Sequence, residues 1–207
     1  MKNKLIISIL VGLIISGCCR KDSVEIARYE LSSDELKIIP YELGEKINFI
    51  HSNGYSFDFN VVEDKIEWKE YHDFCEYNCC GQDYFSYQVR TTIIESSYPR
   101  FNIELSLGGS RIYEYIPKSL NIEINYDYFA RLPYNDSMNF ICDSTTNTTF
   151  FETIILNGKS YTNVTKKLLD TQYIIDTQIL MPKAIYYNEL GIIQIETTNN
   201  ETYTINN

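Results

Sequence analysis

The chain has 207 residues, with 18 basic and 28 acidic side chains and a formal net charge of −10 at pH 7. An acidic surface repels nucleic acid and anionic lipid headgroups, so the charge argues against a nucleic-acid-binding protein. The length fits one domain with a sizeable hydrophobic core, and the 18 Tyr and 10 Phe residues favour β-strands.

The amino-terminal segment has the three-part layout of a bacterial lipoprotein export signal. Lys2 and Lys4 form a basic head, and the apolar run at 5–15 is too short to span a bilayer, which takes about 20 apolar residues. The run ends in Ile-Ser-Gly-Cys at 15–18, where two small residues precede a cysteine. We therefore expect residues 1–17 to be a cleaved signal peptide and Cys18 to carry fatty acyl chains, palmitate among them, that hold the protein on a membrane.

Residues 18–39 are expected to form the lipidated amino terminus and a tether, ahead of a single β domain at 40–207. Within the tether, Ser32 is a suitable N-cap and acidic residues follow it, which predicts a short helix that ends before Pro40. From residue 40 onward, no helical periodicity is sustained over three turns, and no linker divides the chain.

Alternation of apolar and polar residues predicts strands along most of the domain. Asn53-Gly54 and Asn157-Gly158 each stand between two alternating runs. This dipeptide is a strong hairpin signal, because both of its residues tolerate positive φ. The expected strands are residues 45–52, 55–63, 65–71, 84–96, 100–107, 111–116, 120–128, 149–156, 159–164, 172–180, 184–188, 192–197 and 202–206, with a long loop at 131–147.

Many strands joined by short turns predict an all-β fold built on an antiparallel meander. A sheet with one apolar face must curl, close or pack on another sheet. We expect a curved sheet or open barrel, with a two-sheet sandwich as the alternative.

Four cysteines after the amino terminus are candidates for disulfides, which are typical of proteins outside the cytoplasm. Cys75, Cys79 and Cys80 lie in one polar loop, and Cys142 lies in another. A bridge between adjacent cysteines is strained, which favours Cys75 bonded to one of the adjacent pair and Cys142 bonded to the other. Cys19 is then left beside the anchor.

Signals for a metal site or for a catalytic site are weak in this sequence. His72, Cys75 and Cys79, with Asp73 and Glu76 nearby, have spacings that resemble metal ligands, but zinc sites use tighter paired motifs, so no metal or cofactor is expected. The chain has no Gly-x-Ser-x-Gly elbow, no His-Glu-x-x-His and no phosphate loop. We therefore expect a protein without catalytic activity.

Several segments resemble uncharacterised small lipoproteins of Bacteroidota, of the flavobacterial type. They are the start of the domain at 40–49 (Pro-Tyr-Glu-Leu-Gly-Glu-Lys-Ile-Asn-Phe), the hairpin at 157–164, and the runs at 185–188 and 191–195. The resemblance implies an antiparallel β domain on a membrane anchor, and no substrate or catalytic residue. Surface lipoproteins of that group often carry an acidic cluster after the lipidated cysteine, whereas residues 18–23 here contain one acid. The periplasmic face of the outer membrane is therefore favoured over the cell surface.

The sequence leaves several functions open. The leading hypothesis is a membrane-tethered, non-enzymatic β module that binds a small ligand or an envelope protein. A lipocalin-like carrier of an apolar ligand would need a dry cavity lined by Phe and Tyr. An envelope hydrolase acting on glycans would need two carboxylates about 5 to 9.5 Å apart in a cleft. A structural or immunity-type partner would need an exposed apolar patch.

Overall fold

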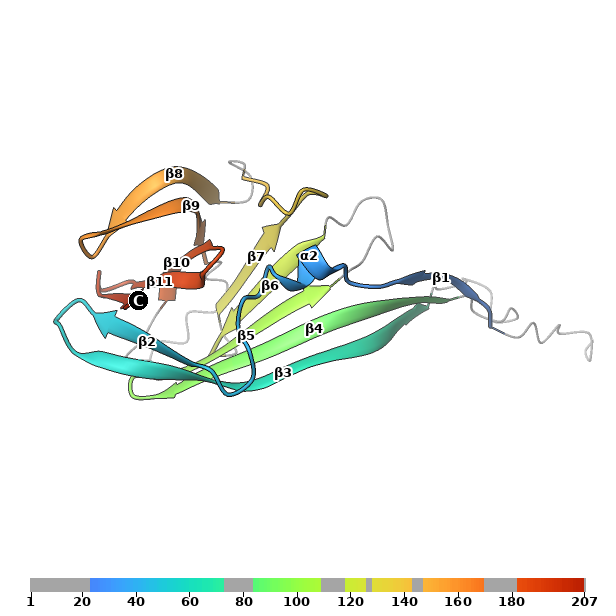
Figure 1. The fold of residues 1–207 in the computed structure, drawn as a ribbon, viewed down its shortest axis with the longest axis horizontal. Helices are drawn as coiled ribbons and strands as arrows, with labels where there is room; N and C mark the ends of the chain where they lie inside the picture. Colours follow the sequence, from blue (N-terminus) through green and yellow to red (C-terminus); the bar gives the residue numbers. More distant parts are fainter. Residues whose placement is uncertain are drawn as a thin grey trace, which may run out of the picture.

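A computed structural model of the chain describes residues 23–72, 84–108, 118–125, 128–142, 147–169 and 182–206. As predicted, the fold is all-β, with one very short helix among the described residues (Figure 1). The helix is α2 (Ser33–Leu36), and the strands are β1 (Glu25–Tyr29), β2 (Lys46–His51), β3 (Ser56–His72), β4 (Tyr84–Ser97), β5 (Arg100–Gly108), β6 (Ser119–Ile124), β7 (Tyr128–Pro133), β8 (Thr148–Leu156), β9 (Lys159–Leu168), β10 (Pro182–Asn188), β11 (Gly191–Thr197) and β12 (Thr202–Ile205).

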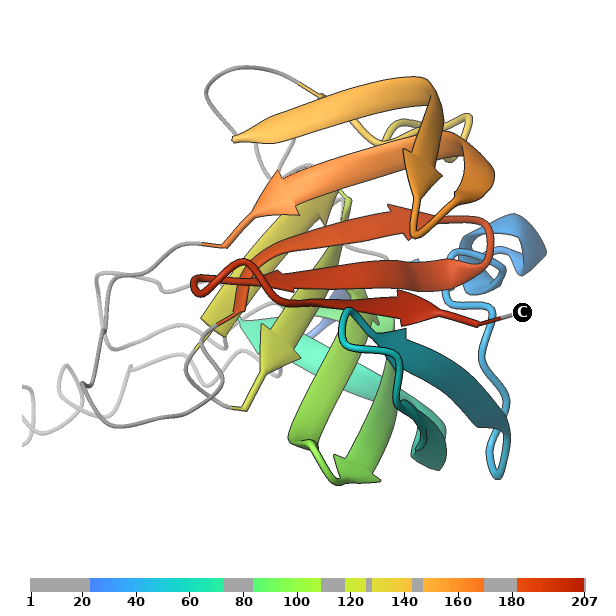
Figure 2. The same cartoon turned by 90° about the vertical axis from the view of Figure 1, so that its left-hand side faces the viewer.

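The strands form one sheet in the order β7-β6-β5-β4-β3-β2-β12-β11-β10-β9-β8. Every pairing along this order is antiparallel, and β1 adds to β4 in parallel. Two meanders, β2 to β7 and β8 to β12, are therefore joined where β2 pairs with β12. The sheet curls strongly (Figure 2), so that β7 and β9, from opposite ends of the order, come into contact. Of the predicted forms, the structure shows the open barrel, and the sheet comes close to closing on itself.

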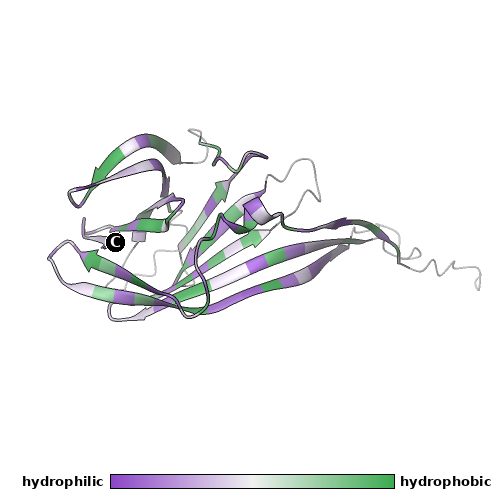
Figure 3. Ribbon diagram, in the orientation of Figure 1, coloured by the Kyte–Doolittle hydropathy of each residue, from purple (hydrophilic) through white to green (hydrophobic). Residues whose placement is uncertain are grey.

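The inside of the curled sheet is filled with apolar side chains. Alternating residues of β2, β5 and β6 face it, and the alternation of apolar and polar residues gives the banded hydropathy pattern in Figure 3. Phe101 on β5 and Tyr203 on β12 meet across the interior, with ring centroids 5.2 Å apart in an edge-to-face arrangement. Side chains from distant parts of the sheet thus pack on each other there.

Several predicted element boundaries are wrong. One long strand, β3, replaces the two expected at 55–63 and 65–71, with a register shift between Val61 and Glu63 marking the junction. The strand expected at 120–128 ends at Ile124, because Asn125 takes a positive φ of 52° and turns the chain. β7 then occupies the first part of the expected loop at 131–147. The strands predicted at 111–116 and 172–180 lie outside the described residues.

The structure also differs from the tether expected at 18–39. The predicted short helix is present as α2, with Ser32 as its N-cap. However, β1 pairs with β4, and Leu31, Ile38 and Ile39 belong to the hydrophobic core. We call residues 36–45 the strap, because this segment crosses from α2 to β2 over the core-facing side of the sheet.

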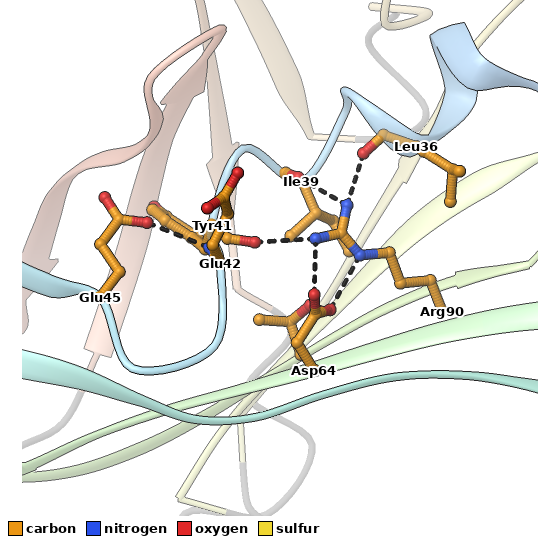
Figure 4. A network of polar contacts seen from close by, with 8 residues as sticks. Leu36, Ile39, Tyr41, Glu42, Glu45, Asp64 and Arg90 are labelled. Atoms are coloured by element: carbon orange, nitrogen blue, oxygen red, sulfur yellow. Dashed lines mark hydrogen bonds and ion pairs between the residues drawn. The ribbon is translucent and has the colours of Figure 1, made fainter.

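Arg90 of β4 holds the strap in place (Figure 4). Its Nη1 donates to the carbonyl oxygens of Leu36 and Ile39 at 2.6 and 2.8 Å. Its Nη2 donates to the carbonyl oxygen of Tyr41 at 2.7 Å. The same guanidinium binds the carboxylate of Asp64 on β3, through Nε at 2.8 Å and Nη2 at 3.0 Å. One buried cation therefore satisfies three backbone carbonyls and one carboxylate.

Two tyrosines fix the other side of the strap. The Tyr41 hydroxyl accepts a hydrogen bond from the backbone N–H of Ile192 at 2.6 Å, and the Tyr187 hydroxyl donates to the carbonyl of Ile38 at 2.7 Å. Gly191 has a φ of +86°, and a Cβ there would lie 2.1 Å from the Tyr41 hydroxyl oxygen. Glycine is therefore required at this turn both for its backbone conformation and for the close approach of Tyr41.

We predict that Arg90→Met lowers the free energy of unfolding by about 3–5 kcal/mol, because it leaves three carbonyls and a partly buried carboxylate without their partner. Urea-induced unfolding measures this loss. Arg100→Met, at an exposed position on β5, is the matched control and should unfold close to the wild-type midpoint. Equal midpoints for the two variants would contradict the role assigned to Arg90.

Candidate functional site

A groove lies at the seam where the barrel stays open. Its walls are α2 and the segment 136–142, and its floor is formed by β8, β9 and the end of β10. The groove has a volume of about 1010 Å³ and opens to solvent. It is large enough for a small ligand or a few units of a polymer.

The floor is a row of side chains that runs across three strands. Phe150 on β8 pairs with Thr165 on β9, and Thr165 pairs with Tyr187 on β10, so the three side chains share one face of the sheet. Asn163, two residues before Thr165 on β9, also lines the groove. Because Phe150 remains about half exposed, at 49%, a ligand can contact its ring directly.

One wall is a compact turn after β7. The Asn135 side chain accepts hydrogen bonds from the backbone N–H groups of Ser137 at 2.9 Å and Asn139 at 3.1 Å. This turn brings the Phe140 ring into an edge-to-face contact with the Tyr187 ring, with centroids 5.7 Å apart. The wall is therefore held by its own hydrogen bonds and by contact with the floor.

The other wall is α2, which is fixed by a capping box. The Ser32 side chain accepts from the N–H of Glu35, and the Glu35 carboxylate accepts from the N–H of Ser32 at 2.8 Å. Lys118 lies 2.8 Å from the same carboxylate, and the Tyr134 hydroxyl donates to it at 3.4 Å. Burial by itself would raise the pKa of Glu35, but the hydrogen bonds from Lys118 and Ser32 and the lysine's charge outweigh it, so the pKa is lowered.

Several charged residues in and beside the groove lie close to a partner of opposite charge. Asp34 and Lys37 on α2 form an ion pair at 2.7 Å, and Asp136 lies 3.8 Å from Lys118. The hydrogen bond from Lys37, together with its charge, lowers the pKa of Asp34. A general acid needs a raised pKa, so Asp34 is a poor proton donor for hydrolysis.

The remaining lining combines aromatic rings with neutral hydrogen-bonding side chains. The rings of Phe140, Phe150 and Tyr187 lie beside amides and hydroxyls from both walls and the floor. Binding sites for small molecules have this mixture of apolar surface and a few placed polar groups. The polar members are Ser32, Ser137, Asn139, Asn163, Thr165 and Asn188.

The structure brings one predicted site residue to the groove. Cys142, a predicted disulfide partner, lies on its lining, and its thiol is 3.8 Å from the carbonyl oxygen of Phe140. The other candidates, Cys75, Cys79 and Cys80, and the lipidation site Cys18, lie outside the described residues, so the disulfide and the anchor stay predictions.

The two histidines lie elsewhere. His72, at the end of β3, is 3.3 Å from a carboxylate oxygen of Glu70. His51 is buried among aromatic rings and stacks on Tyr55, with ring centroids 4.7 Å apart. Across the described ranges, no three His, Cys, Asp or Glu side chains gather closely enough to hold a metal ion.

Comparisons with known proteins give no relatives from which to assign a role. No protein-family model, no curated protein and no solved structure matches the chain. The part of the chain that the structure describes contains no helix with the length and apolarity of a membrane span.

Acidification should destabilise the fold through Glu35 and Asp64. Burial would raise the pKa of Asp64, but hydrogen bonds from Arg90 and Thr92 outweigh it, so the pKa is lowered. The pKa of Glu35 is lowered in the same way by its own partners, Lys118 and Ser32. Both carboxylates therefore stabilise the fold while they are ionised. This stabilisation is complete above their pKa in the unfolded chain, which is about 4, and it is lost as the pH falls through their lower pKa values in the folded protein.

We expect the free energy of unfolding, measured in urea between about pH 7 and pH 3, to decrease toward the acidic end. The Glu35→Gln variant should be less stable at neutral pH and should lose less stability on acidification, because it lacks one of the two groups. A Glu35→Gln curve parallel to that of the wild type would contradict this assignment.

Proposed function

We propose that this protein is a lipid-anchored, non-enzymatic binding module of the bacterial cell envelope. The fold fits a binding domain or a carrier, because a rigid curled sheet presents loops and an open seam to solvent. The support for the anchor is the Ile-Ser-Gly-Cys sequence at 15–18 after a short apolar run. We place the protein at the outer membrane, with the periplasmic face favoured.

The groove at the seam is where we propose that the ligand binds. The observation that carries this proposal is the row Phe150, Thr165 and Tyr187, in which the half-exposed ring of Phe150 lies on the groove floor beside the buried side chains of Thr165 and Tyr187. Neutral amides surround this row, and Asp34 and Lys37 on the α2 wall form an ion pair with each other. Such a surface suits a neutral ligand that has both hydroxyl groups and apolar C–H faces. Among envelope components, glycans have this chemistry.

The packing of the interior favours this surface site over a lipocalin-like cavity. Phe101 and Tyr203 meet inside the barrel, where a carrier of an apolar ligand would keep open space. A hydrolase is also less well supported, since the pKa values of Asp34 and Glu35 beside the groove are lowered, whereas a glycosidase needs one raised carboxyl pKa. We therefore rank both alternatives below a binding module.

The anchor has a direct test. When cells are grown with labelled palmitate, the wild-type chain should incorporate the label, and mass spectrometry should find acyl chains on an amino-terminal peptide that begins at Cys18. Cys18→Ser should abolish incorporation, whereas Cys19→Ser should keep it, because the cleavage site specifies Cys18. Label that persists in Cys18→Ser, or a wild-type chain with an intact leader, would overturn the anchor.

The groove is tested with soluble neutral oligosaccharides and envelope glycan fragments as probes. We expect at least one of them to bind, and Phe150→Ala to weaken that binding by about tenfold through loss of ring contact. Ile155→Ala is the matched control, because Ile155 lies on the same strand, is 71% exposed, and faces the opposite side of the sheet.

Isothermal titration calorimetry with both variants measures the change. Equal affinities for the Phe150→Ala and Ile155→Ala variants would remove the groove from the binding site. If an unstructured peptide binds in place of every glycan, and Phe150→Ala weakens that binding, the groove is retained and the glycan class is wrong.

A further inference from the structure

The long hairpin of β3 and β4, with β1 beside it, extends past the barrel as an arm (Figure 1). One edge of β3 pairs with β4 from Asn60 to His72, whereas the other edge pairs with β2 at residues 56–60. The strap then closes this edge at Val61, whose N–H and C=O bond to Glu45 and Gly44. Within the described chain, no strand pairs with this edge from Glu63 to Glu70. An exposed edge of this length can accept another strand.

Side chains of this segment are accessible and fall into two sets. Alternation along the strand puts Glu63, Lys65, Glu67 and Lys69 on one face. On the face that continues the barrel interior, Ile66 is 47% exposed. The charged set alternates in sign, and Lys65 lies 2.8 Å from Glu63 and 3.6 Å from Glu67 within the strand.

We propose that β3 pairs, antiparallel and edge to edge, with β3 of a second copy of this chain. In a two-fold arrangement centred on Ile66, each Ile66 lies opposite the other. Glu63 then faces Lys69 of the second copy, and Lys65 faces Glu67. By symmetry this register contains four cross-strand pairs of opposite charge, the arrangement that favours strand pairing.

Neighbouring registers are less favourable. A centre at Glu67 places Glu67 against itself and Lys65 against Lys69, so like charges meet. A centre at Lys65 also opposes like charges, at Lys65 itself and at Glu63 with Glu67. A centre at Trp68 keeps two pairs of opposite charge, between Glu67 and Lys69. Of these registers, the one centred on Ile66 therefore has the most cross-strand pairs of opposite charge.

The face of the arm toward the barrel adds an apolar contact. Ile66 would meet its counterpart at the two-fold axis, and Trp68 is 40% exposed next to it. The Arg28 side chain of β1 lies 3.9 Å from the centre of the Trp68 ring, which holds that ring in place before any partner arrives. The interface is short, so we expect reversible association that weakens with added salt.

A charge-reversal experiment tests this pairing in the full chain. Two differently tagged copies are produced together and purified in detergent at low salt through one tag, and the second tag is quantified. One variant carries Lys65→Glu and Lys69→Glu, and the other carries Glu63→Lys and Glu67→Lys. Each variant should capture its own kind about tenfold less than wild type captures wild type, because all four pairs become repulsive.

Mixing the two variants should restore capture, since opposite charges again meet at all four positions. Asp58→Lys, on the part of β3 that pairs with β2, is the control and should leave capture unchanged. Near-UV circular dichroism checks that each variant is folded. Three outcomes would each overturn the proposal: no capture between wild-type copies, undiminished capture within either folded variant, or no restoration in the mixture. None of these readouts depends on a glycan in the groove.

Discussion

The guanidinium of Arg90 is the contact on which this arrangement depends. It joins β3, β4 and the strap by binding the Asp64 carboxylate together with the carbonyls of Leu36, Ile39 and Tyr41. The strap thereby lies on the core instead of in solvent, and α2 is placed as one wall of the groove. A buried cation is costly unless it is fully hydrogen-bonded, and here every arm of the guanidinium has an acceptor. Core packing and the shape of the groove therefore both depend on the contacts of Arg90.

Most of the fold could be predicted from local sequence, and the errors in the prediction have physical causes. Asn157-Gly158 specified its hairpin correctly, because turn chemistry is local. β4 was harder. Its apolar residues Phe85 and Val89 suggest one buried face, yet Gln88 and Arg90 on the opposite face point toward the core. They do so because the chain on either side of α2 brings backbone groups there: Gln88 accepts from the N–H of Leu31, and Arg90 binds carbonyls of the strap. A tertiary contact of this kind leaves no periodic signal.

The candidate site was largely invisible in the sequence. Its floor depends on the register that aligns Phe150, Thr165 and Tyr187, three residues from strands whose pairing is settled only by the complete sheet. Its turn wall lies in a segment that reads as an unstructured loop, although Asn135 carries the ordinary signal of a side chain that hydrogen-bonds backbone two residues on. Cys142 was singled out for its sulfur chemistry, and its place on the groove follows from the same turn.

The junction of β2 with β12 sets the order in which the barrel can be finished. Residues 46–51 are among the first of the barrel to be synthesised, and their neighbours at 203–205 are among the last. Each meander can form from contacts between consecutive strands, but the two halves unite only through this pair, so their union carries the large entropy cost of closing a loop of more than about 150 residues. The half-barrel that exists before then exposes the unpaired edge of β2 to water. A nascent chain therefore remains susceptible to proteases and to mispairing until β12 is in place.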